Sequence, residues 1–131
     1  MGGWMTKAFG NKGERLAARF LRRKGFKILA RQYATRWGEI DLIALDGETV
    51  VFVEVKSRRS QAAGHPVEAI TYDKQKKLTR MALAYLKRHG LLENSARFDV
   101  VAVLWPDGAK QAEVQHYQNA FPAVGLGQMY S

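Results

Sequence analysis

The sequence predicts an α/β fold, with helices packed against a mixed sheet of about five strands in the order helix, three strands, helix, two strands. Two segments repeat apolar residues at helical spacing, and several short segments are rich in Val, Ile, Leu and Phe. The chain has 131 residues, enough for one hydrophobic core and too few for two. We therefore expect a single domain over residues 1–118 and a C-terminal tail over residues 119–131.

The first helix is predicted over residues 11–24, where apolar residues form one face and arginines fill the opposite one. Asn11 and Glu14 have the spacing of an N-terminal capping box, which gives Glu14 a structural explanation that does not exclude a catalytic role. Gly25 follows the last periodic residue and is typical of a helix terminator.

Three strands are expected next, over residues 26–33, 38–45 and 49–57. Asp46-Gly47 between the last two is a strong signal for a hairpin turn. Consecutive strands joined by such short connections pair antiparallel.

Side chains alternate between the two faces of a strand, so the third strand should divide its residues in a regular way. Val51, Val53 and Val55 are expected on one face. Phe52, Glu54 and Lys56 are expected on the other, so that two charged residues share a face with an aromatic one.

The second half of the chain begins with a loop over residues 58–66 and a helix that Thr71 or Asp73 caps and that ends near His89. A buried strand is expected over residues 97–105, parallel to a neighbour because the helix serves as a crossover. A last strand over residues 113–118 is expected at the edge of the sheet.

Composition narrows the class of partner and of metal site. Lys and Arg outnumber Asp and Glu by 21 to 12, and the net charge of +9 favours a polyanion, with nucleic acid ahead of an anionic membrane surface. The chain has no cysteine, so a metal ion would bind to oxygen or imidazole ligands. No apolar run reaches the roughly 18 residues of a membrane span, and the first residues lack the pattern of a signal peptide, so the cytoplasm is the expected location.

One set of charged residues suggests catalysis. Asp41 lies among apolar residues of the second strand, Glu54 lies among valines of the third, and their hairpin can bring them side by side. Two buried carboxylates repel each other unless a cation compensates them. With Lys56 on the face of Glu54, this set suits phosphodiester hydrolysis assisted by Mg²⁺.

Several of these charged residues also have a structural interpretation that involves no catalysis. Glu54 and Lys56 would also fit the solvent face of an edge strand. Glu39 shares the face of Asp41 and either joins the cluster or lies at its rim. His65 is a candidate for metal or substrate contact, although a lone loop histidine usually has neither role.

Four segments of the sequence carry a family resemblance: GERLAARFLRRKGFKIL, GEIDLIALDGETVVFVEVKSR, DKQKKLTRMALAYL and RFDVVAV. From Gly10 to Val103 the chain resembles the YraN-like family of small bacterial proteins. That family is similar to archaeal Holliday-junction resolvases and to the restriction-endonuclease-like PD-(D/E)XK superfamily, whose core has the element order expected above. Gln32 stands where the family commonly has an asparagine.

The resemblance implies that Asp41, Glu54 and Val55 bind Mg²⁺ or Mn²⁺ and that Lys56 is the catalytic lysine. Glu14 matches the N-terminal acid of the resolvases, which joins the metal site. The implied activity is that of a metal-dependent DNA endonuclease, acting on branched or damaged DNA. By analogy with the resolvases, a symmetric homodimer would supply two active sites.

Two other functions compete with this one. The chain could be a nucleic-acid-binding module with weak or no catalysis, serving DNA repair, recombination or uptake. It could also be a structural protein whose charge serves only solubility. Paired buried carboxylates favour the enzyme, since a pure binder has no need of them.

Overall fold

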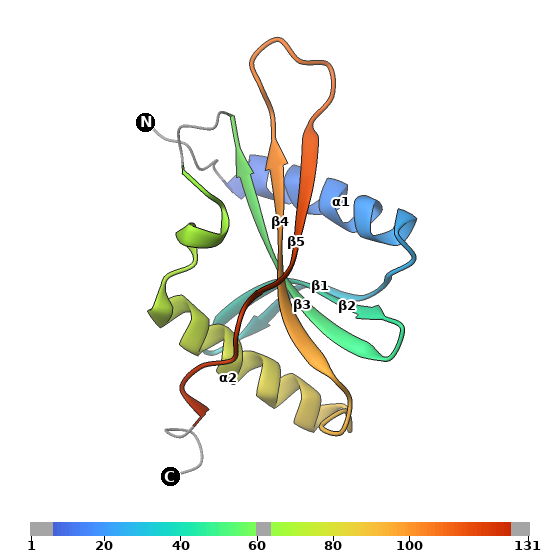
Figure 1. Ribbon diagram of the computed structural model, residues 1–131, viewed down its shortest axis with the longest axis vertical. Coiled ribbons are helices and arrows are strands. Elements are labelled where there is room, and N and C mark those ends of the chain that lie inside the picture. The colour runs from blue at the N-terminus through green and yellow to red at the C-terminus, as the bar shows by residue number, and fades with distance from the viewer. Residues whose placement is uncertain (1–6, 60–63, 127–131) are drawn as a thin grey trace.

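The computed structural model describes residues 7–59 and 64–126, and its architecture is a mixed five-stranded sheet with one helix on each face (Figure 1). The predicted fold class and element order are confirmed. The elements are α1 (Lys7–Arg23), β1 (Lys27–Thr35), β2 (Gly38–Asp46), β3 (Thr49–Arg58), the short helix η2 (Val67–Ala69), α2 (Tyr72–Arg88), β4 (Ala96–Leu104) and β5 (Glu113–Phe121).

The strands lie in the spatial order β1-β2-β3-β4-β5. The first three form the predicted antiparallel meander, and β4 pairs parallel to β3 after the crossover through α2. Strand β5 returns antiparallel to β4 and ends the sheet, as expected for an edge strand.

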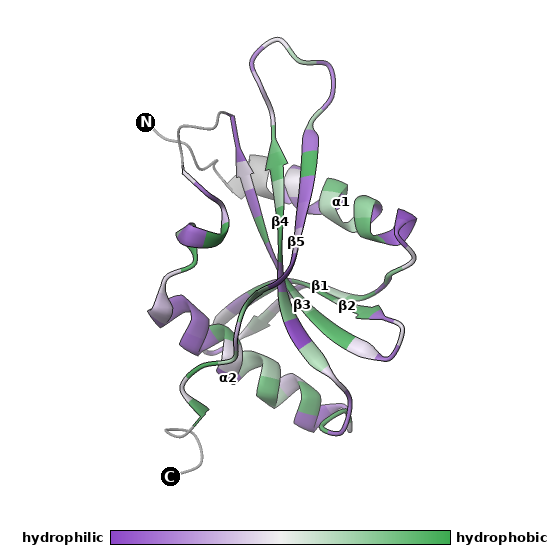
Figure 2. Ribbon diagram, viewed as in Figure 1, coloured by the Kyte–Doolittle hydropathy of each residue, from purple (hydrophilic) through white to green (hydrophobic). Residues whose placement is uncertain are grey.

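Each face of the sheet has its own hydrophobic core, because residues of β3 and β4 alternate between the faces. Phe52 and Val100 pack towards α2, whereas Val51, Val53 and Val101 pack towards α1. In Figure 2 both helices change between hydrophobic and hydrophilic colouring along their length, as amphipathic helices do. The predicted division of β3 is therefore confirmed for its core positions.

Two predicted boundaries are wrong. Helix α1 begins at Lys7, so Asn11 lies within the helix and does not cap it; its Oδ1 accepts a hydrogen bond of 2.6 Å from Nε2 of Gln32 instead. Strand β5 continues to Phe121, so residues 119–121 do not belong to the predicted tail. Asn119 adopts a φ of 51° at a register shift, and the strand resumes beyond it with Phe121 stacked on Phe98.

The predicted cap of α2 is confirmed at the first of its two candidates. Thr71 has an extended backbone, and its Oγ1 accepts a hydrogen bond of 3.2 Å from the N–H of Lys74. Asp73 lies in the first turn, where its charge favours the helix dipole. The cap fixes the start of α2 near the middle of the sheet and thereby positions the first-turn residue Lys74.

The sheet forks between β2 and β3. Their ladder runs from Asp46 opposite Thr49 to Leu42 opposite Val53 and then stops. Beyond this point β3 continues along β4, while β2 pairs only with β1, and Figure 1 shows β1 and β2 turning away from the upper part of β3. The next residue on each strand is acidic: Asp41 on β2 and Glu54 on β3.

Close contact between α1 and β3 predicts that Gly13→Ala destabilises the protein. A methyl group at position 13 would overlap Oγ of the buried Ser57 and lie 3.2 Å from its Cβ. Overpacking of this kind costs about 1–3 kcal/mol, which exceeds the gain of roughly 1 kcal/mol from replacing a helical glycine. Urea denaturation measures the change, and Ser57→Ala in the same chain should recover part of it. A Gly13→Ala variant more stable than wild type would show that α1 has room to move away.

Candidate active site

Asp41 lies in the plane of the sheet at the fork. Ile40 belongs to the core under α2 and Leu42 to the core under α1, so the regular alternation of β2 is broken at Asp41 between them. Its Oδ2 accepts a hydrogen bond of 2.8 Å from the N–H of Val55 on β3. This side-chain bond takes over where the backbone ladder between the strands ends.

The irregularity of β2 has a counterpart on β1. The pairs Tyr33–Ile40 and Arg31–Leu42 leave Gln32 facing Asp41, and Gln32 has a φ of 49°. Asparagine adopts this left-handed conformation more readily than glutamine does. An asparagine at position 32 would therefore suit the backbone conformation found here better than Gln32 does.

Glu54 is buried beside Asp41, with 6% of its surface exposed. Its Oε1 lies 3.7 Å from Nζ of Lys74, while the buried Oε2 accepts no hydrogen bond among the described residues. Burial and the charge of Asp41 raise the pKa of Glu54 to about 8, although Lys74 and Lys56 oppose this. Burial also raises the pKa of Asp41, against the hydrogen bonds that it accepts from the N–H of Val55 and from the carboxyl group of Glu54.

Glu14 reaches the same cluster from α1. It is 4% exposed, and its buried Oε1 has only a long ion pair of 4.0 Å with Nε of Arg31 among the described groups. Burial and the charge of Asp41 raise the pKa of Glu14 to about 7. Three elements thus bring three carboxylates within electrostatic reach of one another.

Two lysines face this acidic cluster. Lys56, predicted from the sequence, is half-buried on β3, and its charge lowers the pKa of both Asp41 and Glu54. Lys74 in the first turn of α2 acts on the same two groups and was not predicted. The sequence does contain a feature that could have identified Lys74: a lysine in the first turn of a helix is unfavourable and needs a compensating acidic partner.

The donor set fits a hard divalent cation. Carboxylate oxygens are the ligands that Mg²⁺ prefers, and Oε2 of Glu54 is buried without a partner among the described residues. In residues 7–59 and 64–126 no three His, Cys, Asp or Glu side chains form a ready-made metal cage. Asp41 and Glu54 would therefore hold the ion together with water, and Val55 could contribute only its carbonyl oxygen, since its side chain is apolar.

Glu39 and His65, whose roles the sequence did not decide, lie outside the cluster of Glu14, Asp41 and Glu54. Glu39 is exposed at the rim, from which its charge raises the pKa of Glu14. His65 is also exposed: its Nδ1 accepts a hydrogen bond of 3.2 Å from the N–H of Val67, and its ring packs on Tyr117. His65 therefore stabilises the turn that leads into η2.

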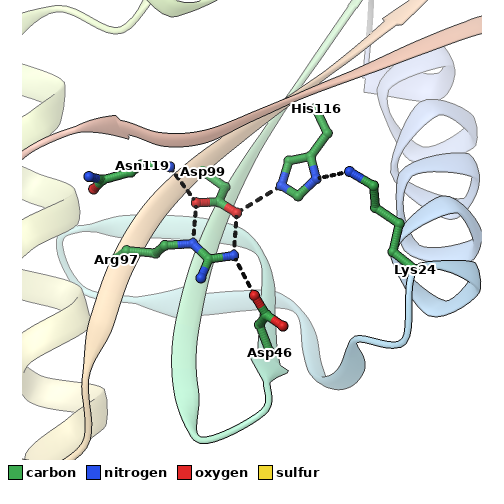
Figure 3. Close-up of polar contacts among 6 residues, drawn as sticks. All are labelled: Lys24, Asp46, Arg97, Asp99, His116 and Asn119. Atoms are coloured by element: carbon green, nitrogen blue, oxygen red, sulfur yellow. Dashed lines mark hydrogen bonds and ion pairs between the residues drawn. The ribbon is translucent and has the colours of Figure 1, made fainter.

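A second buried polar cluster lies under the C-terminal end of α1 (Figure 3). Asp99 on β4 is 0% exposed and accepts hydrogen bonds from Arg97 (2.9 Å) and from the N–H of Asn119 (2.9 Å), with Nε2 of His116 at 2.8 Å. Nδ1 of His116 lies 2.9 Å from Nζ of Lys24. No motif in the sequence predicted this cluster, which joins the end of α1 to β4 and to the bulge in β5.

The raised pKa of Glu54 predicts that Glu54→Gln stabilises the metal-free protein in mild alkali. With a pKa of about 8 instead of 4.5, the folded protein holds a proton that the unfolded chain has released. Stability therefore falls as the pH rises from about 4.5 to about 8. The glutamine carries no such penalty and should raise the free energy of unfolding near pH 8 by on the order of a few kcal/mol.

Urea denaturation in the presence of a chelator, near pH 5 and near pH 8, measures this effect. The advantage of the variant should be large at the higher pH and small at the lower one. Equal stability of the two proteins near pH 8 would contradict the burial of a charged Glu54.

Comparison with known proteins identifies a family model that spans the residues of the candidate site. A family model described as "Uncharacterised protein family UPF0102" matches residues 13–103, which include Glu14, Asp41, Glu54, Lys56 and Lys74.

Curated proteins with the same family designation match most of the chain. A UPF0102 protein of Rhodopirellula baltica is 48% identical over 124 residues, which cover 92% of this chain and 74% of that protein. A UPF0102 protein of Alkaliphilus metalliredigens is 42% identical and covers 89% of this chain and 100% of its own length. A third, from Geobacter sulfurreducens, is 45% identical, with 88% and 90% covered. In the described part of this chain, neither helix has the length and apolar character needed to cross a membrane.

Proposed function

Because the chain belongs to the uncharacterised protein family UPF0102, the YraN-like family expected from its motifs, and carries an acidic pair, one buried and one partly buried, at the fork of its sheet, we propose that it is a metal-dependent DNA endonuclease. In this proposal it is of the restriction-endonuclease-like PD-(D/E)XK type. Its reaction centre consists of Asp41, Glu54 and Lys56.

The pair of Asp41 and Glu54, in which Glu54 is buried and Asp41 partly buried, is the observation that supports this proposal most strongly. A structural carboxylate in a core normally has its hydrogen bonds satisfied, as Asp99 does in the same protein. Glu54 instead accepts no hydrogen bond at its buried Oε2 among the described residues, has Lys74 only at 3.7 Å, and shares a hydrogen bond with the second carboxyl group, Asp41. Such an arrangement costs stability, and binding of a divalent cation would offset that cost.

Each residue of the fork has a role suited to its chemistry. A bound Mg²⁺ or Mn²⁺ would polarise the scissile phosphate and favour ionisation of a water molecule. Asp41 and Glu54 would hold the ion, and the hydrogen bond from Val55 keeps Asp41 turned towards Glu54. Lys56 would orient the attacking water or stabilise charge that develops on the phosphate.

Two further residues would adjust this centre from the flanking helices. Lys74 lies 3.7 Å from Glu54, so it holds that carboxylate in place and adds positive charge beside the phosphate. Glu14 adds negative charge from α1 and is available to a bound water or cation.

DNA is the proposed substrate because the net charge of +9 suits a polyanion. We include branched or damaged DNA in the proposal because the resemblance of the sequence motifs to resolvases implies such a substrate. Symmetric cutting of a branch needs two active sites, so we include a homodimer in this proposal.

Incubation of the purified protein with supercoiled plasmid and with a synthetic four-way junction, in Mg²⁺, Mn²⁺ or chelator, tests the proposal. We expect cleavage in either metal, none in chelator, and none with Asp41→Ala, which excludes a contaminating nuclease. DNA binding without cleavage in every condition would contradict the proposal in favour of a nucleic-acid-binding module.

A further inference from the structure

A basic groove lies on the flank of α1, away from the acidic cluster. It has a volume of about 600 Å³, within the range of ligand-binding clefts, and lies between α1 and the hairpin that joins β4 to β5. Figure 1 shows α1 beside the upper parts of these two strands. Of the elements that form the groove, only α1 also contributes to the proposed reaction centre, through Glu14.

The charged residues that line this groove are all basic. Its described lining contains no acidic residue, and none of its cations forms an ion pair with a described carboxylate. Uncompensated cations in a concave site attract an anion more strongly than the same charges on a flat surface do. The cationic lining residues are Lys12, Arg15, Arg19, Arg23 and Lys110.

The groove also contains an apolar and aromatic surface. Leu16 and Phe20 of α1 face Trp105 and Val114 of the hairpin, and all four are only partly buried. Nζ of Lys12 lies 4.8 Å from the ring centroid of Trp105, so the ring already supports a cation at its face. A partner for this groove must offer negative charge and flat apolar surface together.

From this combination we infer that the groove binds single-stranded DNA, with phosphates on the cations of α1 and a base against Trp105. Bases of a single strand are free to stack on aromatic side chains, whereas a duplex presents its backbone and keeps its bases stacked inside. The inference rests on the proposed function, because it takes DNA as the substrate. It specifies a strand with unpaired bases, such as one found at a branch or a lesion.

The regular spacing of the basic residues along α1 suits the sugar-phosphate backbone of an extended DNA strand. Lys12, Arg15, Arg19 and Arg23 follow one another at intervals of three or four residues, so they form a row along one side of the helix. Glu14 leaves the same helix towards the fork. A strand held along this row therefore has a fixed relation to the acidic cluster.

Binding of a fluorescein-labelled oligothymidylate in the presence of a chelator tests this inference without any cleavage. Arg15→Gln with Arg19→Gln removes two exposed cations of the row, and Arg88→Gln is the matched control at the exposed end of α2. We expect the double variant to bind at least about tenfold more weakly and to lower the slope of log K against log salt by roughly 0.7 per cation. The control should bind as wild type does.

Trp105 provides an independent readout. Oligothymidylate should quench part of the tryptophan fluorescence of the wild type, and Trp105→Phe should remove most of that quenching while circular dichroism confirms the fold. Equal loss of affinity in the double variant and the control, or equal competition by a duplex of the same length, would overturn the inference.

The two proposals fail in different ways. If the double variant binds normally while the wild type still cleaves in Mg²⁺, the groove inference is wrong and the nuclease remains. If the wild type never cleaves but the groove variants lose oligothymidylate binding, the groove inference holds and the nuclease is wrong.

Discussion

Glu54→Gln is expected to reduce metal-dependent DNA cleavage by more than about 100-fold, because residues that merely orient a metal ligand already cost 10–100-fold when they are changed. The glutamine keeps the shape of the side chain and removes the charge that would hold the cation. Initial rates of plasmid nicking at saturating Mn²⁺ measure the effect.

Two controls separate catalysis from folding and binding. Glu39→Gln makes the same change at the exposed rim of the fork and should cleave within a few-fold of wild type. DNA affinity of Glu54→Gln in chelator should equal or exceed that of wild type, because the substitution adds no negative charge that would repel the DNA backbone. Cleavage by Glu54→Gln at the wild-type rate would exclude Glu54 from the reaction centre.

The second large effect concerns stability and lies away from the fork. Asp99→Ala is expected to lower the free energy of unfolding by about 3 kcal/mol, because it leaves the buried imidazole of His116 and the partly buried guanidinium of Arg97 without their common acceptor. Asp99 is fully buried, and its loss also frees the N–H of Asn119 in the β5 bulge.

Asp46 provides the matched control, because it forms a more exposed ion pair with the same arginine. Asp46 pairs with the same Arg97 at 3.0 Å but its side chain is 42% exposed, so Asp46→Ala should cost at most about 1 kcal/mol. Urea denaturation near neutral pH compares the two. Similar losses in both variants would show that burial of Asp99 does not strengthen its ion pairs.

The contribution of Asp99 should also depend on pH. Burial raises its pKa, but the hydrogen bonds with His116 and Arg97 outweigh burial and hold it below the ordinary value of 3.8. A depressed pKa stabilises the folded state above 3.8, and this stabilisation is lost as the pH falls below it. The difference between wild type and Asp99→Ala should therefore shrink in acid.

Local signals in the sequence predicted most of the fold. The hairpin turn after β2 and the Thr71 cap each act within a few residues. The cap was located correctly, and the turn lies one residue beyond the predicted Asp46-Gly47, at Gly47-Glu48. The start of α1 was wrong because Asn11 makes its hydrogen bond with Gln32, a distant residue that no local pattern identifies. The end of β5 was wrong because the positive φ of Asn119 is accommodated by the bulge opposite Asp99.

The candidate site was predictable as far as strand pairing determines it. The hairpin register places Asp41 and Glu54 next to each other, and alternation places Lys56 beyond them. The fork itself could not be predicted, since it depends on where β2 leaves β3 for β1. Lys74 reaches Glu54 from α2, which packs on the face of the sheet that Phe52 and Glu54 share, so only the packed structure reveals it.

Binding of a divalent cation at the fork is the central claim, and calorimetric titration with Mn²⁺ in the absence of DNA tests it most directly. We expect the wild type to bind the ion at a site that Asp41→Asn abolishes and Glu39→Gln preserves, with release of protons near pH 7 because Glu14 and Glu54 have raised pKa values. Equal heats for the wild type and Asp41→Asn, or no binding by the wild type, would contradict the account.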